Sequence, residues 1–170
     1  MKAIVTAGIL GLTLCVSIRA AHAELSTLAP SRVIAFSADE SGRVQVALMF
    51  DVSEIARADV GEALLEWNLS AMESEGEYDF SVSRIDAAWD HELASRLEVA
   101  DDAGANWTFE ALDYERNGGG LVRFEITEFV RDWVEGNRGN FGVVISTKDL
   151  GVSDIRSDLS GPRLTIRYRR

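Results

Sequence analysis

Two tryptophans lie in stretches whose residue types could bind a sugar. Trp89 lies within Ala-Ala-Trp-Asp-His-Glu, outside any clean alternation of apolar and polar residues, and Trp107 follows an acidic stretch at 101–106. An indole ring on a polar loop presents a flat apolar face to a sugar ring, and a neighbouring carboxylate can orient the sugar hydroxyls. We therefore predict that Trp89 and Trp107 contact a ligand and that Asp90 orients it. The alternative is that both rings pack against the edge of the fold.

The residue types of most hydrolytic sites are scarce. The sequence has no Gly-x-Ser-x-Gly turn, one cysteine, Cys15, and two histidines, His22 and His91. Nucleophilic catalysis and zinc sites of the usual kind draw on these residue types. A glycosidase needs only two carboxylates, and the chain has 28 acidic residues. We expect that the protein is not an enzyme, with a weak glycosidase as the remaining alternative.

Carboxylates in the expected loops are the only candidates for holding a metal ion. Calcium takes oxygen ligands, but the sequence has no Asp-x-Asp-x-Asp series with a closing Glu. We expect no cofactor. A structural calcium ion is a weak alternative to a solvated acidic rim made by Asp39, Glu40, Asp101, Asp102, Asp149 and Asp154.

The first 23 residues have the pattern of a secretory signal peptide. Lys2 supplies a positive start, residues 3–18 are almost wholly apolar, and Ala21-His22-Ala23 is a cleavage site of the A-x-A type. Cleavage after Ala23 leaves 147 residues without cysteine and lowers the formal net charge from −11 to −13. The sequence predicts a periplasmic or secreted protein with no membrane span after cleavage. Its acidity argues against nucleic acid as a partner.

Apolar residues alternate with polar ones in most of the remaining chain. Val44, Val46, Leu48 and Phe50 share one face of an expected strand at 43–51. About nine such short strands, separated by turn clusters, predict an all-β fold, an antiparallel β-sandwich with jelly-roll topology. We expect a single domain at 24–170, in which 24–31 is a loose lead-in. In the last strand Thr165, Arg167 and Arg169 should face outward.

One stretch departs from this period of two. Phe129, Val130, Trp133 and Val134 fall on one face at helical spacing, and Gly136 follows where a positive φ is wanted. The sequence therefore predicts one short helical turn near 127–135 between two strands.

Three stretches together resemble the DNRLRE-type domain family. They are ALMFDVS at 47–53 with EALLEW at 62–67, FEITEFVRDW at 124–133 with NFGVVI at 140–145, and GPRLTIRY at 161–168. The resemblance covers roughly residues 43–168 and implies a secreted, non-catalytic jelly-roll module. Some members of the family are counted among carbohydrate-binding modules, with alginate-like acidic polysaccharides among their ligands. The sequence departs from the family at Met49, where a basic residue is common, and in a shortened segment at 33–42.

These observations lead to one expected function and one alternative. The expected function is non-catalytic binding of a polysaccharide or cell-surface glycan. The alternative is a structural or protein-interaction domain of an envelope or extracellular assembly, with envelope or extracellular proteins as partners. The first should have an aromatic-lined site, and the second an exposed apolar patch or a free strand edge.

Overall fold

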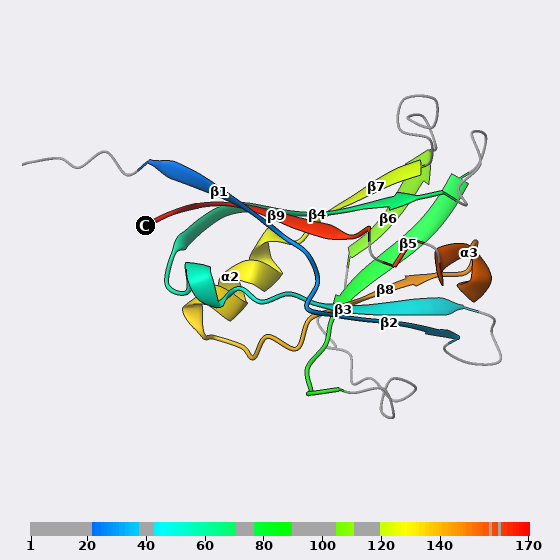
Figure 1. Cartoon of the computed structure of the whole chain (residues 1–170), viewed down its shortest axis with the longest axis horizontal. Coiled ribbons are helices and arrows are strands. Elements are labelled where there is room, and N and C mark those ends of the chain that lie inside the picture. Colours follow the sequence, from blue (N-terminus) through cyan, green and yellow to red (C-terminus); the bar gives the residue numbers. More distant parts are fainter. Residues whose placement is uncertain are drawn as a thin grey trace, which may run out of the picture.

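A computed structural model of the chain describes residues 22–37, 43–70, 77–89, 105–110, 120–156, 158–159 and 161–170. These residues form antiparallel strands in two sheets, with helices between and beside them (Figure 1). One sheet has four strands in the order β1-β9-β4-β7, and the other has five in the order β2-β3-β8-β5-β6. The strands are β1 (Ala23–Leu28), β2 (Arg32–Ser37), β3 (Val44–Met49), β4 (Asp59–Leu69), β5 (Glu77–Arg84), β6 (Ala105–Glu110), β7 (Gly120–Glu125), β8 (Val143–Thr147) and β9 (Arg163–Arg169).

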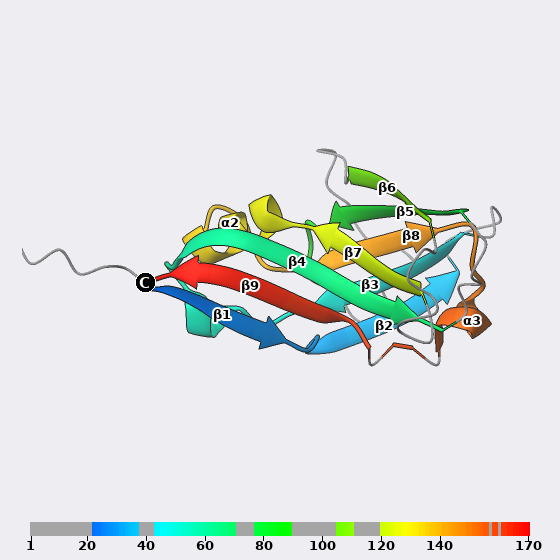
Figure 2. The same ribbon diagram turned by 90° about the horizontal axis from the view of Figure 1, so that it is seen from above.

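The strand pairs are nested. β5 pairs with β6, β4 with β7, β3 with β8 and β1 with β9, and every pair is antiparallel. The chain therefore runs out and back as one long ribbon whose successive pairs alternate between the two sheets. β2 adds to the free edge of β3. Figure 2 shows the four strands β1, β9, β4 and β7 side by side over the second sheet.

The two sheets share a core because the strands alternate in polarity. In β4 the buried residues include Ala63, Leu65 and Trp67, while the residues between them are partly exposed, as expected for a half-buried strand. The ring of Phe80 from one sheet meets that of Phe124 from the other edge-on, with 5.9 Å between the ring centroids. The prediction of antiparallel β structure in two facing sheets is confirmed.

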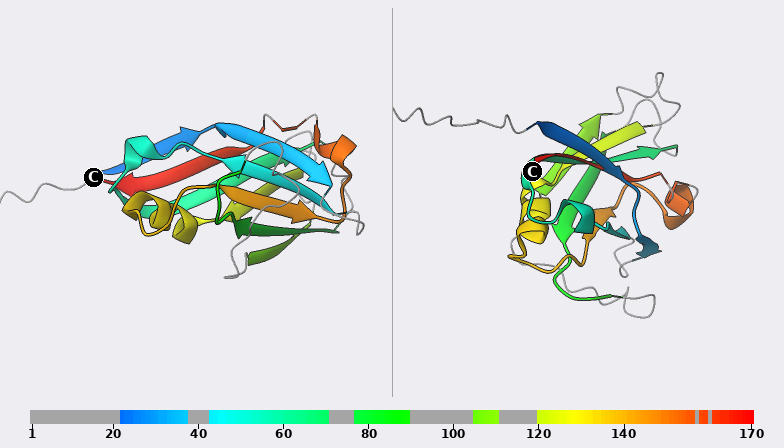
Figure 3. Two further views of the ribbon diagram at one scale, coloured as in Figure 1. Left: turned by 90° about the horizontal axis from the view of Figure 1, so that it is seen from below. Right: turned by 60° about the vertical axis from the view of Figure 1, so that its left-hand side comes forward.

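The predicted helical turn is also confirmed. α2 (Thr127–Glu135) buries Val130, Trp133 and Val134 against the core and ends at Gly136, whose φ of 76° is left-handed. It lies at the end of the sandwich that also carries the start of β1 and the C-terminus (Figures 2 and 3). Two shorter helices are η1 (Ser53–Ile55) and α3 (Val152–Arg156). None of the described helices is long and apolar enough to cross a membrane.

The expected loose lead-in at 24–31 is wrong for residues 24–28. Residues 24–28 lie in β1, which pairs with β9 from Ala23 opposite Arg169 to Leu28 opposite Leu164. β1 is mostly exposed and gives no alternating pattern in the sequence. Backbone pairing with β9, rather than burial of side chains, accounts for this strand. Residues 29–31 then carry the chain to β2 in the other sheet.

Candidate functional site

Trp89 does not have the exposed ring that the sequence analysis expected. It is only 3% exposed and packs with Ala47, Ile85 and Val144 in a small apolar cluster on the outer face of the five-stranded sheet. The indole N–H donates a hydrogen bond of 2.6 Å to the carbonyl oxygen of Phe141. The predicted ligand contact of Trp89 is therefore wrong, because a buried ring cannot stack on a sugar. The alternative interpretation, packing against the sheet, applies to this residue.

Arg32 covers the buried ring. Its guanidinium lies 5.3 Å from the centroid of the Trp89 ring and donates a hydrogen bond of 2.5 Å to the Trp89 carbonyl oxygen. The contact holds the segment after β5 against the sheet.

The side chains of two predicted binding residues lie outside what the structure describes. Asp90 lies outside the described residues, as do Asp39, Glu40, Asp101 and Asp102 of the acidic rim. Trp107 is described only through its backbone, which pairs with Phe80 in β6 and β5. Ligand contact by Trp107 and Asp90 therefore stays a prediction. Across the described ranges, no three His, Cys, Asp or Glu side chains are grouped so that they could hold a metal ion.

Arginines gather on the outer face of the four-stranded sheet, the face turned away from the core. β9 exposes every second residue there, as its sequence predicted, and places arginines opposite acidic residues of β4. The Nε–H of Arg123 in β7 donates a hydrogen bond of 2.8 Å to a carboxylate oxygen of Glu66, and Nη2 of the same guanidinium lies 2.6 Å from that oxygen. Across the sheet, Arg169 lies opposite Asp59, Arg167 opposite Glu62, and Glu66 between Arg163 and Arg123.

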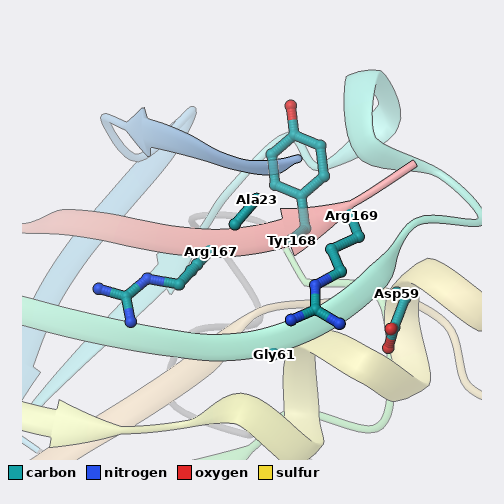
Figure 4. A pocket seen from close by; sticks show the side chains of 6 residues that line it. All are labelled: Ala23, Asp59, Gly61, Arg167, Tyr168 and Arg169. Atoms are coloured by element: carbon teal, nitrogen blue, oxygen red, sulfur yellow. The ribbon is translucent and has the colours of Figure 1, made fainter. Parts of the chain in front are cut away.

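A glycine makes a hollow in this face. The pairing of β4 with β9 shifts by one residue between Val60 and Glu62, so Gly61 is the extra residue of a β-bulge. A pocket of about 180 Å³ opens there. Figure 4 shows Arg167 and Arg169 reaching from β9 over β4, with the Arg169 guanidinium above Gly61. The pocket is lined by Ala23, Asp59, Gly61, Arg167, Tyr168 and Arg169.

The side chain of Arg169 differs from those of its neighbours in having no bound partner among the described residues. Arg167 lies 3.6 Å from a carboxylate oxygen of Glu62. In contrast, neither the Arg169 side chain nor the Asp59 side chain forms a hydrogen bond or an ion pair with any described residue, although the two residues lie opposite each other in the strand register. The pocket thus holds a free planar donor and a free carboxylate on two sides of a glycine floor.

Tyr168 ties the start of β1 to this site. Its hydroxyl donates a hydrogen bond of 3.0 Å to a carboxylate oxygen of Glu24, and Arg170 lies 3.9 Å from the same oxygen. The hydrogen bond to Glu24 raises the pKa of the Tyr168 phenol above its usual value, with burial as a second cause. Glu24 and Ala23 are thereby held beside the pocket.

Sequence reasoning found part of this site. The alternation in the last strand placed Arg167 and Arg169 outward, which the structure confirms. It could not find the hollow, because the bulge at Gly61 and the position of Asp59 depend on the register between β4 and β9. Comparison with known proteins adds no relative: no family model matches the chain, and no curated protein matches it.

Proposed function

We propose that the protein is a non-catalytic module that binds an acidic polysaccharide through the outer face of its four-stranded sheet. The observation that carries the proposal is the free guanidinium of Arg169 above Gly61, in a pocket of about 180 Å³. Guanidinium groups bind carboxylates through two parallel hydrogen bonds. This location replaces the one expected at Trp89.

The two free groups of the pocket suit a sugar acid better than a neutral sugar or a simple anion. Arg169 offers N–H donors to a carboxylate, and Asp59 offers acceptors to hydroxyl groups. A uronic acid unit carries both kinds of group. A simple anion would gain from Arg169 but meet repulsion from Asp59.

The proposal has to overcome the overall charge of the protein. A chain with a formal net charge of −11 repels an anionic polymer at long range. At physiological salt this repulsion is screened beyond about 8 Å, so local charge decides close contact. On this face the arginines of β9 and β7 balance the acidic residues of β4 and β7, so the face lacks the net negative charge of the whole chain, and the ligand should lie against Arg169.

We propose jelly-roll topology for the fold and membership of the DNRLRE-type family. The nested pairs β5–β6, β4–β7, β3–β8 and β1–β9 support the topology, because a jelly roll is a double sheet made from such a wrapped ribbon. Membership rests on the three sequence stretches already quoted. A secreted or periplasmic location, proposed with it, rests on the signal-peptide pattern at 1–23.

A catalytic role has less support than binding. Glycoside hydrolysis generally uses a pair of carboxylates that flank the bond. Of the described residues that line the pocket, Asp59 alone carries a carboxylate. We therefore propose binding without cleavage.

The second candidate function is a structural or protein-interaction domain. Leu25 favours it, since this side chain is 66% exposed in the middle of β1, an edge strand of its sheet. Exposed apolar residues on an edge strand are typical of protein contacts. This function predicts an oligomer, or a protein partner, that is lost in Leu25→Ser.

The proposed function is tested by affinity gels that contain acidic or neutral polysaccharides, with and without calcium. The protein should be retarded by an acidic polymer, and Arg169→Ala should weaken binding about tenfold, as for a lost hydrogen bond to a charged group. Arg43→Ala, which changes an exposed arginine just before β3, is the charge-matched control. Trp107→Ala tests the site expected from the sequence. If Arg43→Ala weakens binding as much as Arg169→Ala, or if no polymer retards the folded protein, the proposal is wrong.

A further inference from the structure

The pocket includes a residue that signal-peptide cleavage would remove. Ala23 lines the pocket and lies opposite Arg169 in the register of β1 and β9. It is also the last residue of the A-x-A cleavage pattern. Cleavage after Ala23 would take this residue out of the pocket wall and leave the α-amino group of Glu24 in its place.

We propose that removal of the signal peptide completes the binding site, and that the new α-ammonium group of Glu24 is part of it. This inference rests on the proposed function and on the signal-peptide prediction. The ammonium group adds a third positive charge beside Arg167 and Arg169. The ligand class follows from that chemistry: a carboxylated glycan whose negative groups contact all three.

The neighbours of the new N-terminus favour this role. Glu24 has a carboxylate of its own, but that carboxylate already accepts the hydrogen bond from Tyr168 and lies 3.9 Å from Arg170. The same contacts hold residue 24 in β1 at the edge of the pocket. The ammonium group is therefore positioned by the fold and not neutralised by its own side chain.

Electrostatic repulsion predicts how cleavage changes the affinity for the ligand. Without a ligand, the ammonium group, Arg167 and Arg169 repel one another, and Asp59 and Glu62 offset this only in part. A bound carboxylate relieves the repulsion. In the uncleaved chain the same nitrogen is a neutral amide, and the Ala23 side chain occupies part of the space. The precursor should bind the ligand more weakly than the processed protein.

The sequence allows a clean test, because it contains two lysines, Lys2 and Lys148. Lys2 leaves with the signal peptide. In a processed Lys148→Arg variant the α-amino group is therefore the only amine. The full-length variant is expressed with its own signal peptide in a secreting bacterial host, and the intact mass of the product shows where the chain begins. A chain that begins at Glu24 agrees with the inference, and any other start overturns it.

Half of the purified variant is then acetylated at about pH 6.5 and compared with the untreated half. Acetylation should weaken binding of an acidic polysaccharide about two- to fivefold, the size expected for one exposed charge interaction. A version that retains His22 and Ala23 before Glu24 should show a similar loss. Unchanged affinity on acetylation, together with loss of binding in Arg169→Ala, overturns this inference and leaves the proposed function standing.

If no polysaccharide binds, inorganic sulfate tests whether the α-ammonium group of Glu24 takes part in anion binding. Inorganic sulfate should raise the melting temperature of the untreated protein more than chloride does at equal ionic strength, because a bound anion stabilises the folded state. Because sulfate also stabilises folded proteins in general, the difference should become smaller on acetylation rather than disappear. Equal responses of the two halves to sulfate would overturn the inference, independently of the failure of the proposed function.

Discussion

The arginines on the outer face of the four-stranded sheet differ in what surrounds each guanidinium. Arg123 forms a hydrogen bond and an ion pair with one carboxylate oxygen of Glu66, and Arg167 has a longer contact of 3.6 Å with Glu62. Arg169 faces Asp59 across the glycine bulge without binding any described side chain. Only such an unengaged group can bind a ligand without first losing a protein partner. Ligand binding at this site therefore depends on the Arg169 guanidinium and on the space above Gly61.

That space can be filled without removing a charge. A Cβ atom at Gly61 would have its nearest neighbour, the carbonyl oxygen of Arg167, at 3.6 Å, which is ordinary contact. Gly61→Val should leave the midpoint of urea unfolding almost unchanged and weaken binding to an acidic polysaccharide at least tenfold, because the new side chain occupies the pocket. Thr165→Val on the same face is the control. Strong binding by a stably folded Gly61→Val would show that the ligand lies elsewhere.

The link between Tyr168 and Glu24 makes a prediction for alkaline pH. The pKa of the phenol is raised, chiefly by its hydrogen bond to Glu24, so this contact contributes stability at all pH values below the pKa of the unfolded chain. The contribution is lost as the pH rises through the higher pKa of the folded chain. Absorbance near 295 nm should show one tyrosine that ionises later than a free tyrosine, and Tyr168→Phe should remove it. A late transition that persists in Tyr168→Phe would contradict this assignment.

Elements whose apolar residues recur at a regular spacing were predicted from the sequence. The strand β1, which is held mainly by backbone pairing with β9, was not. The alternation of Val44, Val46 and Leu48 gave β3, and the helical spacing around Trp133 gave α2. β1 was missed because its stability comes from backbone bonds to β9, and a strand that buries little has no sequence pattern. The burial of Trp89 was not predicted either, because it also depends on contacts between distant parts of the chain. Its environment is made by Arg32 and Phe141, which lie far away in the sequence.

An ion pair holds α2 to the five-stranded sheet. The guanidinium of Arg84, 4% exposed, donates a hydrogen bond of 2.8 Å to Asp132 and lies 5.3 Å from the ring centroid of Phe129. Asp132→Asn leaves the buried charge without its main counter-ion and should lower the free energy of unfolding by about 3 kcal/mol. Glu128→Gln, which breaks the exposed pair with Arg131, should cost about 0.3 kcal/mol.

Urea unfolding of Asp132→Asn, of Glu128→Gln and of the double mutant Arg84→Met/Asp132→Asn measures how much each variant lowers the free energy of unfolding. The double mutant should be more stable than Asp132→Asn alone, because no buried charge is left uncompensated. Equal losses in Asp132→Asn and Glu128→Gln would contradict the assigned role of Arg84.

Gly142 fixes the start of β8 against β3. Its φ is +92°, and a Cβ atom there would lie 2.0 Å from the carbonyl oxygen of Leu48. Gly142→Ala should therefore lower the free energy of unfolding by about 3 kcal/mol or more, as strain and overlap add. Gly136→Ala at the end of α2 has a positive φ but no neighbour within 4 Å, and should cost about 1 kcal/mol. Calorimetry of both variants tests this order, and a larger loss in Gly136→Ala would contradict it.

At the scale of the whole molecule, the two outer faces differ in character. The outer face of the five-stranded sheet carries the apolar cluster around Trp89, and that of the four-stranded sheet carries the rows of arginine and acidic side chains. The start of β1 and the C-terminus lie at one end of this second face (Figure 2). The proposed site therefore lies next to the peptide bond that signal-peptide cleavage would break. The fold class followed from the sequence, but the division of roles between the faces depends on strand register.

Binding of an acidic glycan at Arg169 and Gly61 can be observed residue by residue in solution. The most direct measurement is an NMR titration of the processed protein with a short oligouronate, following backbone amides and arginine Nε–H groups. The shifts should be concentrated at Gly61, Arg167 and Arg169, with little change at Gln45, Ser81 and Ser146 on the other sheet. Shifts confined to that other sheet, or no shifts at millimolar ligand, would contradict binding at this site.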